Sequence, residues 1–390
     1  QNRHRSAYDH DGDGYSEIPK LHGQTIGFRS FLKTTTYSKL TFEYHHMEEF
    51  RRGGDLLNRP PHEANVAEQT EHSINGGGLK FDYFSPNENH RFNVFASAQH
   101  INRDSYYGPG DRDPLDAYGN TTDLNWMAGS QYVYSFGKCI FMPSDLTAGI
   151  EFNQDKLEDN MWGYNRTVDQ KVNIGSAFFQ NEWKNEHWGF LIGGRLDKHN
   201  LIDHVIFSPR ANLRYNPTEN INLRFSYSSG FRAPQAFDED LHVENVGGNV
   251  AMVELADNLK EERSQSLSVS ADIYHRFGAF QVNFLVEGFY TKLSDVFALT
   301  DGEVVDGILT RTRHNASGAQ VLGLTLEGKM AYLNKIQVQA GVTLQQSHYS
   351  KPHIWNKEAP AVKKMMRTPN TYGYFTATYT PIKPLSIALS

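Results

Sequence analysis

The connections between the expected strands of this chain alternate between short turns and long polar segments almost to its end. Short turns are expected at residues 33–37, 85–90, 136–145, 185–187, 216–219, 276–278, 333–335 and 381–384. Long segments lie between them at residues 45–72, 102–122, 153–170, 229–262, 293–315 and 346–369, and only residues 197–203 form a brief connection on that side. A membrane-spanning barrel has this asymmetry, because its tight turns face the periplasm and its long loops face the outside.

Apolar and polar residues also alternate within the expected strands. In the segment 336–345, apolar residues occupy every even position from Ile336 to Leu344, and Gln, Gly or Thr occupies every odd position. Successive side chains of a strand point to opposite faces, so each such segment has one apolar and one polar face. We count about sixteen segments, many near the roughly 9–11 residues that cross a bilayer at a tilt. They lie near residues 22–33, 38–45, 75–85, 90–101, 124–135, 146–154, 171–184, 187–196, 204–215, 220–229, 263–275, 279–292, 317–331, 334–346, 370–380 and 384–390, with a further one at 2–8.

These two patterns predict an all-β fold, a transmembrane antiparallel up-and-down β-barrel with about 16–17 strands in this chain. The alternative is a soluble antiparallel sheet, whose strands also alternate but whose loop lengths would be irregular. The chain contains no run of about 18 apolar residues, so no transmembrane helix is expected. Aromatic residues make up 13% of the chain, and many stand near strand ends, where barrels place their aromatic girdles.

The composition also limits partners and compartments. The net charge of -7, without a basic stripe, argues against a nucleic-acid partner. The single Cys139 has no second cysteine in this chain to pair with, and we interpret it as a structural residue in a turn. The chain starts without Met, has no signal peptide, and stops inside an expected strand at residues 385–390. We therefore interpret residues 1–390 as one partial barrel domain of a longer protein.

The sharpest local motif is Asp9-His10-Asp11-Gly12-Asp13-Gly14, which matches the first half of a calcium-binding loop. Three carboxylates on alternate residues can converge on a hard cation. The closing acid of such a loop is absent, because Lys20 occupies its place, and Glu17 is the nearby substitute. The motif predicts a calcium site at Asp9, Asp11, Asp13 and Glu17, and the alternative is a solvated acidic turn.

A second pair of motifs flanks one long loop. Gly230, Phe231, Arg232, Ala233 and Pro234 form a GFRAP sequence at the end of one strand, and the loop returns through Asn258, Leu259, Lys260, Glu262 and Ser264. This passage resembles the TonB-dependent outer-membrane receptors, although Glu261 stands where many members have Pro. The opening segment DHDGDGYSEIP and the sequence EFRRGG at 49–54 further resemble receptors of the Bacteroidetes, including cobalamin- and siderophore-type members.

The resemblance covers essentially the whole chain as barrel and implies a fold and a set of partners. It implies a 22-stranded barrel in the cell outer membrane, plugged by an N-terminal domain that contacts TonB. Neither the plug nor the last strands are recognisable in this sequence. The expected partners are outer-membrane lipid, the TonB complex, a large nutrient and a surface lipoprotein.

We assign ligand capture to aromatic and basic residues of the long loops. Aromatic faces stack on flat groups, and Arg pairs with carboxylate or phosphate. The candidates are Arg51, Arg52, Tyr106, Tyr107, Trp162, Tyr164, Arg232, Trp355 and Asn356. For each aromatic residue, the alternative is a girdle or loop-packing role. His45 and His46 are weaker candidates for contact with haem or a metal complex.

The sequence contains no H-E-x-x-H or G-x-S-x-G motif, so the chain is not expected to be an enzyme. The predicted function is a TonB-dependent receptor that binds cobalamin, a siderophore–iron complex or haem for energised uptake, with oligosaccharide also open. The alternatives are a passive 16-stranded porin and a soluble β-rich binding protein. No cofactor is expected to be required, and calcium is the one ion that a motif predicts.

Overall fold

A computed structural model describes residues 1–390 except 110–116, 247–248, 306, 334, 355–359 and 367. Most of the described chain forms one 18-stranded sheet. Its strands are β1 (Asn2–Arg5), β2 (Ser16–Thr35), β3 (Ser38–Gly54), β4 (Val66–Phe84), β5 (His90–Pro109), β6 (Tyr118–Cys139), β7 (Met142–Met161), β8 (Arg166–Lys184), β9 (Trp188–His199), β10 (Ile206–Thr218), β11 (Ile221–Arg232), β14 (Glu262–Phe277), β15 (Phe280–Ser294), β18 (Ala319–Tyr332), β19 (Ile336–His353), β20 (Val362–Lys364), β21 (Thr371–Ile382) and β22 (Leu385–Leu389).

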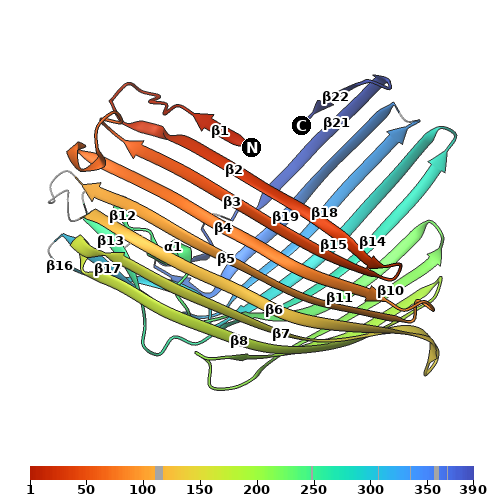
Figure 1. The fold of residues 1–390 in the computed structure, drawn as a ribbon. Helices are drawn as coiled ribbons and strands as arrows, with labels where there is room; N and C mark the ends of the chain where they lie inside the picture. The colour runs from red at the N-terminus through yellow and green to blue at the C-terminus, as the bar shows by residue number, and fades with distance from the viewer. Residues whose placement is uncertain (110–116, 247–248, 306, 334, 355–359, 367) are drawn as a thin grey trace.

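The strands pair in an antiparallel meander that curls into a barrel wall (Figure 1). Neighbours in sequence are neighbours in the sheet, except where β11 pairs with β14, β15 with β18 and β19 with β21. Among the described residues, no pairing joins β22 to β1 or β2. The predicted all-β, up-and-down transmembrane barrel is confirmed. No helix in the described parts of the chain is long and apolar enough to span a membrane.

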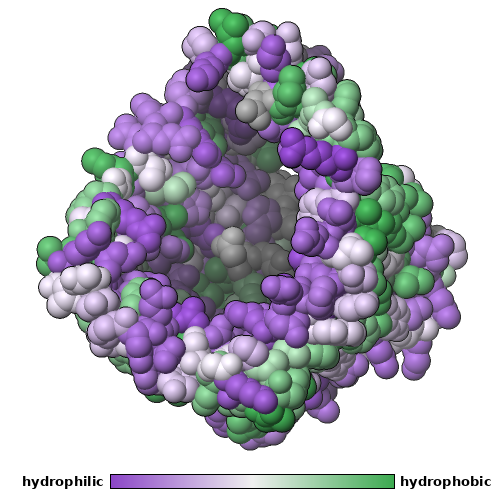
Figure 2. All heavy atoms as spheres, turned by 90° about the vertical axis from the view of Figure 1, so that its right-hand side faces the viewer, coloured by the Kyte–Doolittle hydropathy of each residue, from purple (hydrophilic) through white to green (hydrophobic). Residues whose placement is uncertain are grey.

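The two faces of the wall differ as the alternation predicts. On β7, the apolar side chains of Leu146, Ile150 and Phe152 share the outer face, and Ile150 is 63% exposed. The intervening residues Asp145, Thr147 and Glu151 face the interior. Viewed from the short-turn end, the molecule is hollow and its interior is lined mainly by hydrophilic residues (Figure 2).

The short turns are close to the positions predicted from the sequence, but the strands continue much further at the other end. Residues 45–72 were expected to be mainly loop, yet β3 runs to Gly54 and β4 begins at Val66. The expected loop at 153–170 is likewise mostly β7 and β8, joined by a 3₁₀ turn at Trp162–Tyr164. These predictions were wrong because the alternation ends where the strands leave the membrane, although the backbone pairing continues beyond it.

Four additional strands lie at this long-loop end. They are β12 (Glu244–Val246), β13 (Asn249–Leu255), β16 (Phe297–Val305) and β17 (Ile308–Asn315), and they form a separate four-stranded sheet. The short helix α1 (Asp238–Leu241) precedes β12, and a further 3₁₀ turn, Pro61–Glu63, lies between β3 and β4. Figure 1 shows this small sheet and α1 beside the ends of β5 to β8.

Candidate ligand-binding mouth

Two long connections combine into one structure at the mouth of the barrel, which we call the cap. The cap comprises residues 233–261, between β11 and β14, and residues 295–318, between β15 and β18. Strand β13 of the first connection pairs in parallel with β17 of the second, from Val250 opposite Ile308 to Leu255 opposite Arg313. Backbone pairing therefore joins the two connections into one unit.

A small apolar core attaches the cap to the wall. Tyr106 and Tyr107 of β5, which are 2% and 4% exposed, pack in one buried cluster with residues of β13 and of the connection before it. The other buried members are Ala67, Ala117, Met161, Tyr164, Val243, Val250 and Met252. Because these residues come from both the wall and the cap, the core holds the cap against the tips of β4 to β8.

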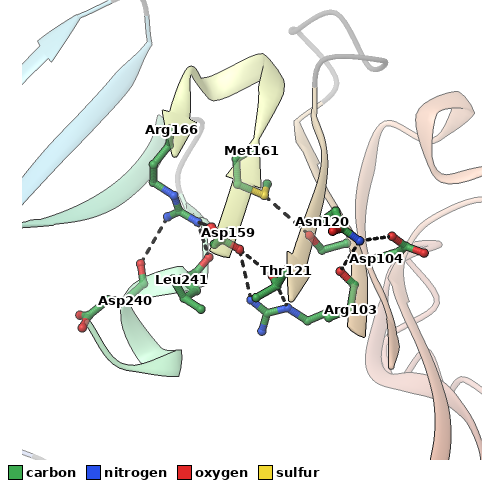
Figure 3. Close-up of polar contacts among 10 residues, drawn as sticks. Arg103, Asp104, Asn120, Thr121, Asp159, Met161, Arg166, Asp240 and Leu241 are labelled. Atoms are coloured by element: carbon green, nitrogen blue, oxygen red, sulfur yellow. Dashed lines mark hydrogen bonds and ion pairs between the residues drawn. The ribbon is translucent and has the colours of Figure 1, made fainter. Parts of the chain in front are cut away.

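A buried cluster of ion pairs reinforces this attachment (Figure 3). Asp159 of β7 is 1% exposed, and its carboxylate lies 2.8 Å from Arg166 Nη2 and 3.6 Å from Arg103 Nη2. The Thr121 hydroxyl donates to Asp159 Oδ1 at 2.6 Å and accepts from Arg103 Nε at 3.1 Å. A buried carboxylate is tolerated when it is paired and hydrogen-bonded in this way.

The same cluster extends into the cap. Arg166 Nη2 donates to the carbonyl oxygen of Leu241 at 2.7 Å, and Arg166 Nη1 donates to that of Asp240 at 3.3 Å (Figure 3). The Asp240 carboxylate forms an ion pair with Arg313 of β17. All of these charged side chains are buried, so wall strand β8, helix α1 and the small sheet are connected through one polar network.

The GFRAP residues build the base of the cap. Gly230, Phe231 and Arg232 end β11, and the Arg232 guanidinium lies over the rings of Phe237 at 4.0 Å and Phe297 at 5.5 Å. Gln170 of β8 donates to the carbonyl oxygen of Ala236 at 3.2 Å and accepts from its backbone N–H at 2.7 Å. Ala233 is buried and Pro234 is half-buried in the same segment.

The second family motif joins the cap's two connections. The side-chain amide of Asn315 donates to the carbonyl oxygens of Lys260 at 2.9 Å and Asp295 at 2.8 Å. The Glu262 carboxylate accepts from the backbone N–H of Phe297 at 2.9 Å. Asn258 is exposed and Leu259 half-buried just before this point. Both motifs thus contribute scaffold contacts that shape the mouth.

A buried histidine contacts the cap from the wall. His199, the last residue of β9, is fully buried, and its Nδ1 accepts from the backbone N–H of Leu201 at 3.0 Å. Its Nε2 lies 3.3 Å from Gln235 Oε1 of the cap. Burial lowers the pKa of His199, so the neutral imidazole fits this arrangement.

Four of the predicted ligand contacts are buried in packing. Tyr106, Tyr107 and Tyr164 belong to the core under the cap, and the Tyr164 hydroxyl donates to the carbonyl oxygen of Tyr107. Arg52 is 1% exposed, and its guanidinium donates to the carbonyl oxygens of Gly53 and Asp55. Strands extend past the membrane and bring loop-like sequence into a protein core, so these four side chains pack against protein instead of facing solvent. Their contact with a ligand stays a prediction.

Of the other predicted ligand contacts, three are at least partly exposed and two lie outside the described residues. Trp162 is 66% exposed at the tip between β7 and β8. The Arg51 side chain is 54% exposed and pairs with Glu49 at 2.6 Å. Arg232 is half-buried in its stack with Phe237 and Phe297. Trp355 and Asn356 lie outside the described residues.

The expected calcium ligands lie together at the rim. One ligand atom from each of Asp9, Asp11, Asp13 and Glu17 lies within 4.8 Å of the others, and all four residues are exposed. The carboxylates also accept from backbone N–H groups: Asp9 from Gly12 at 2.7 Å and from Gly14 at 2.9 Å, and Glu17 from His10 at 2.6 Å. Hard oxygen donors at this spacing fit the ligand chemistry of Ca²⁺.

The inner wall below the cap is polar and charged. Arg195 pairs with Glu151 at 2.8 Å and Asp197 at 2.7 Å, and Ser176 donates to the same Asp197 carboxylate. Arg214 and Arg224 lie directly opposite each other on β10 and β11. These residues suit a water-filled interior that receives a polar molecule or another polar domain.

A family model described as "TonB dependent receptor-like, beta-barrel" matches residues 2–387. The chain belongs to the TonB-dependent receptor family. This assignment agrees with the absence of catalytic motifs, since the family and the similar structures are receptors and transporters. No curated protein sequence matches the chain.

Solved structures of siderophore receptors and of an iron transporter share the fold at low sequence identity. The siderophore receptor PirA from Acinetobacter baumannii has a TM-score of 0.71 at 14% identity, over 97% of this chain and 59% of that one. PirA from Pseudomonas aeruginosa has a TM-score of 0.67 at 13% identity, over 96% and 68%. The iron transporter FrpB from Neisseria meningitidis has a TM-score of 0.69 at 13% identity, over 99% and 62%. The chain thus spans between 59% and 68% of the length of these three proteins.

The residues of the buried ion cluster could not be identified from the sequence. Asp159 and Arg166 lie in a segment that was expected to be loop, and the carbonyl oxygens that Arg166 contacts are 74 and 75 residues away. No local pattern encodes such distant contacts. Gln170 and His199 also lack a local signal for the same reason.

Proposed function

We propose that the protein to which this barrel belongs takes up a ferric siderophore across the outer membrane, energised through TonB. The family match over residues 2–387 carries this proposal. The ligand class follows from the similar structures, which include siderophore receptors and an iron transporter. The long-loop end, with the cap, then faces the outside, and the short turns face the periplasm.

The residues that would first meet the ligand are the accessible ones at the mouth. Arg51 offers a guanidinium next to Glu49, and Trp162 offers an exposed indole. Arginine pairs with anionic oxygens, and aromatic faces stack on planar groups such as catecholates. The proposal includes a surface lipoprotein as a co-receptor at this end.

Uptake by living cells tests the proposal. Cells that carry the complete gene are compared with a deletion strain for uptake of ⁵⁵Fe bound to a catecholate or a hydroxamate siderophore, of haem, and of labelled cyanocobalamin. The proposal predicts that one ferric siderophore is taken up only by cells with the gene, and that an uncoupler of the proton-motive force abolishes this uptake. Uptake of haem or cyanocobalamin alone would contradict the ligand class. Uptake insensitive to the uncoupler, with open-channel conductance, would support a passive porin instead.

We also propose that Asp9, Asp11, Asp13 and Glu17 bind one Ca²⁺ ion at the rim. Their convergence within 4.8 Å supports this. Isothermal titration of the folded protein with CaCl₂ should show one site, which Asp11→Asn weakens and which Asp203→Asn, an exposed acid in the turn between β9 and β10, leaves unchanged. Equal calcium affinity of the Asp11→Asn variant and the unmodified protein would exclude the site.

A further inference from the structure

The outer face of β7 and β8 changes from apolar to polar residues in successive rows, and Trp126 of the neighbouring strand β6 lies at the change. On β7, the outward residues from Leu146 to Phe152 are apolar, and the next outward residue is Gln154. Trp126 lies 5.2 Å from Phe152, and its indole N–H donates to Gln154 Oε1 at 3.2 Å. Gln154 in turn donates to Asn173 Oδ1 at 2.7 Å. An aromatic residue that joins an apolar band to a polar row marks the membrane–water boundary.

Two lysines lie immediately beyond this boundary. Lys156 of β7 and Lys171 of β8 are directly opposite each other in the sheet, on the same face as Gln154 and Asn173. Both side chains are exposed. Their height places the two ammonium groups at the level of the lipid headgroups, and their long stems allow each ammonium group to extend toward that layer.

The two lysines form one row of like charges, and a row of opposite charge follows it. The next outward pair, Glu158 and Asp169, is also directly opposed and carries two negative charges. Lys156 forms an ion pair with Glu158 along its own strand, whereas Lys171 makes no ion pair with any residue that the structure describes. Like charges directly opposite each other in a sheet are destabilising. The Lys156–Glu158 ion pair offsets part of this repulsion, and an anion bound between Lys156 and Lys171 would offset more of it.

We propose that Lys156 and Lys171 bind the phosphate group of an anionic lipid in the outer leaflet. The occupant is a lipid because the site is on the outside of the barrel, directly above the apolar band and away from the mouth. The chemistry is that of a phosphate held by two ammonium groups, with the acyl chains against Phe152 and the apolar wall below. The inference depends on the membrane placement of the wall and not on the proposed cargo.

Lipid binding to the folded protein in detergent micelles tests this site. Native mass spectrometry measures retention of phosphatidylglycerol, which is anionic, and of phosphatidylcholine, which is zwitterionic. The matched control is Lys33→Gln/Lys39→Gln, because Lys33 and Lys39 are also directly opposed but lie on the inner face at the short-turn end. A shift in gel mobility on heating verifies that each variant is folded.

The unmodified protein and the control variant should both prefer phosphatidylglycerol. Each lysine removed from the site should reduce that affinity roughly fivefold, so Lys156→Gln/Lys171→Gln should lose the preference. If that double variant does not fold, Lys171→Gln alone gives the same test, because Lys171 has no ion pair to lose. Unchanged binding by the folded Gln variant, an equal loss in the control, or displacement of the lipid by millimolar inorganic phosphate would overturn the proposal.

Discussion

The two halves of strand β7 are held by different forces. From Leu146 to Phe152, outward apolar residues alternate with inward polar ones, and backbone pairing with the neighbouring strands holds this half in place. From Asp155 to Met161, the same strand contributes Asp159 to a buried ion cluster and Met161 to a small core. The membrane wall is therefore a repetitive structure, whereas the cap attachment depends on a few specific side chains. Changes that damage one half should leave the other largely intact.

The largest expected effect is on the cap. Asp159→Asn removes the negative charge that Arg166 and Arg103 share and leaves two buried guanidinium groups without it. Removal of one partner from a buried ion pair typically costs about 3–5 kcal/mol. Hydrogen exchange should show faster exchange of the β13 and β17 amides, with the heat-shifted gel mobility of the barrel unchanged. Loss of that gel shift would show that the cap and the wall are not independent.

A change in the wall should destabilise the barrel without loosening the cap. A Cβ atom at Gly149 would lie 2.7 Å from the backbone oxygen of Ser130 and 2.3 Å from the ring of Phe178. Overpacking of this kind costs about 1–3 kcal/mol, so Gly149→Ala should lower the unfolding temperature of the barrel and leave cap exchange unchanged. Gly175→Ala is the control, because a Cβ there meets nothing within 4 Å. Equal unfolding temperatures for the two variants would contradict this packing.

The contact between β9 and the cap should respond to pH. The pKa of folded His199 lies below its ordinary value of 6.5, so the unfolded form binds more protons as the pH falls below that value. The stability that neutral His199 contributes is present above pH 6.5 and declines as the pH falls toward the folded pKa. Exchange of the Leu201 and Ala236 amides should therefore be faster at pH 5.5 than at pH 7.5, after correction for intrinsic rates. His199→Gln should lose most of this extra dependence; if it keeps the full dependence, another group is responsible.

The smallest effect is expected for an exposed ion pair on the cap itself. Arg311 and Asp301 lie 3.0 Å apart with side chains 27% and 43% exposed. Exposed pairs contribute about 0–1 kcal/mol, so Asp301→Asn should change cap exchange little. Both this variant and Asp159→Asn remove one carboxylate charge, so their comparison shows whether loosening of the cap depends on the burial of that charge. If both variants loosen the cap equally, the buried position of Asp159 is not what matters.

The contrast between wall and cap also explains which features of the structure could be predicted from the sequence. Period-two alternation and short turns located nearly every wall strand, because each strand's environment is repeated along the chain, as in 336–345 and β19. The upper strand ends were missed because both faces there meet water or protein rather than lipid. Tyr106 and Arg52 were expected at a ligand because their sequence context looks like loop, yet they pack under or beside the cap. The GFRAP residues were identified as a family motif, but their contacts with Gln170 and Phe297 required the structure.

Cysteine scanning along β7 tests the division between wall and cap most directly. In a Cys139→Ser background, spin labels are placed singly from Leu146 to Asn160 in protein reconstituted into bilayers, and collisions with lipid-dissolved oxygen are measured. High oxygen contact is expected at 146, 148, 150 and 152, low contact at the odd positions between them, and loss of the pattern from Gln154 onward. Alternation that continues unchanged to Asn160, or that is absent below Gln154, would contradict it.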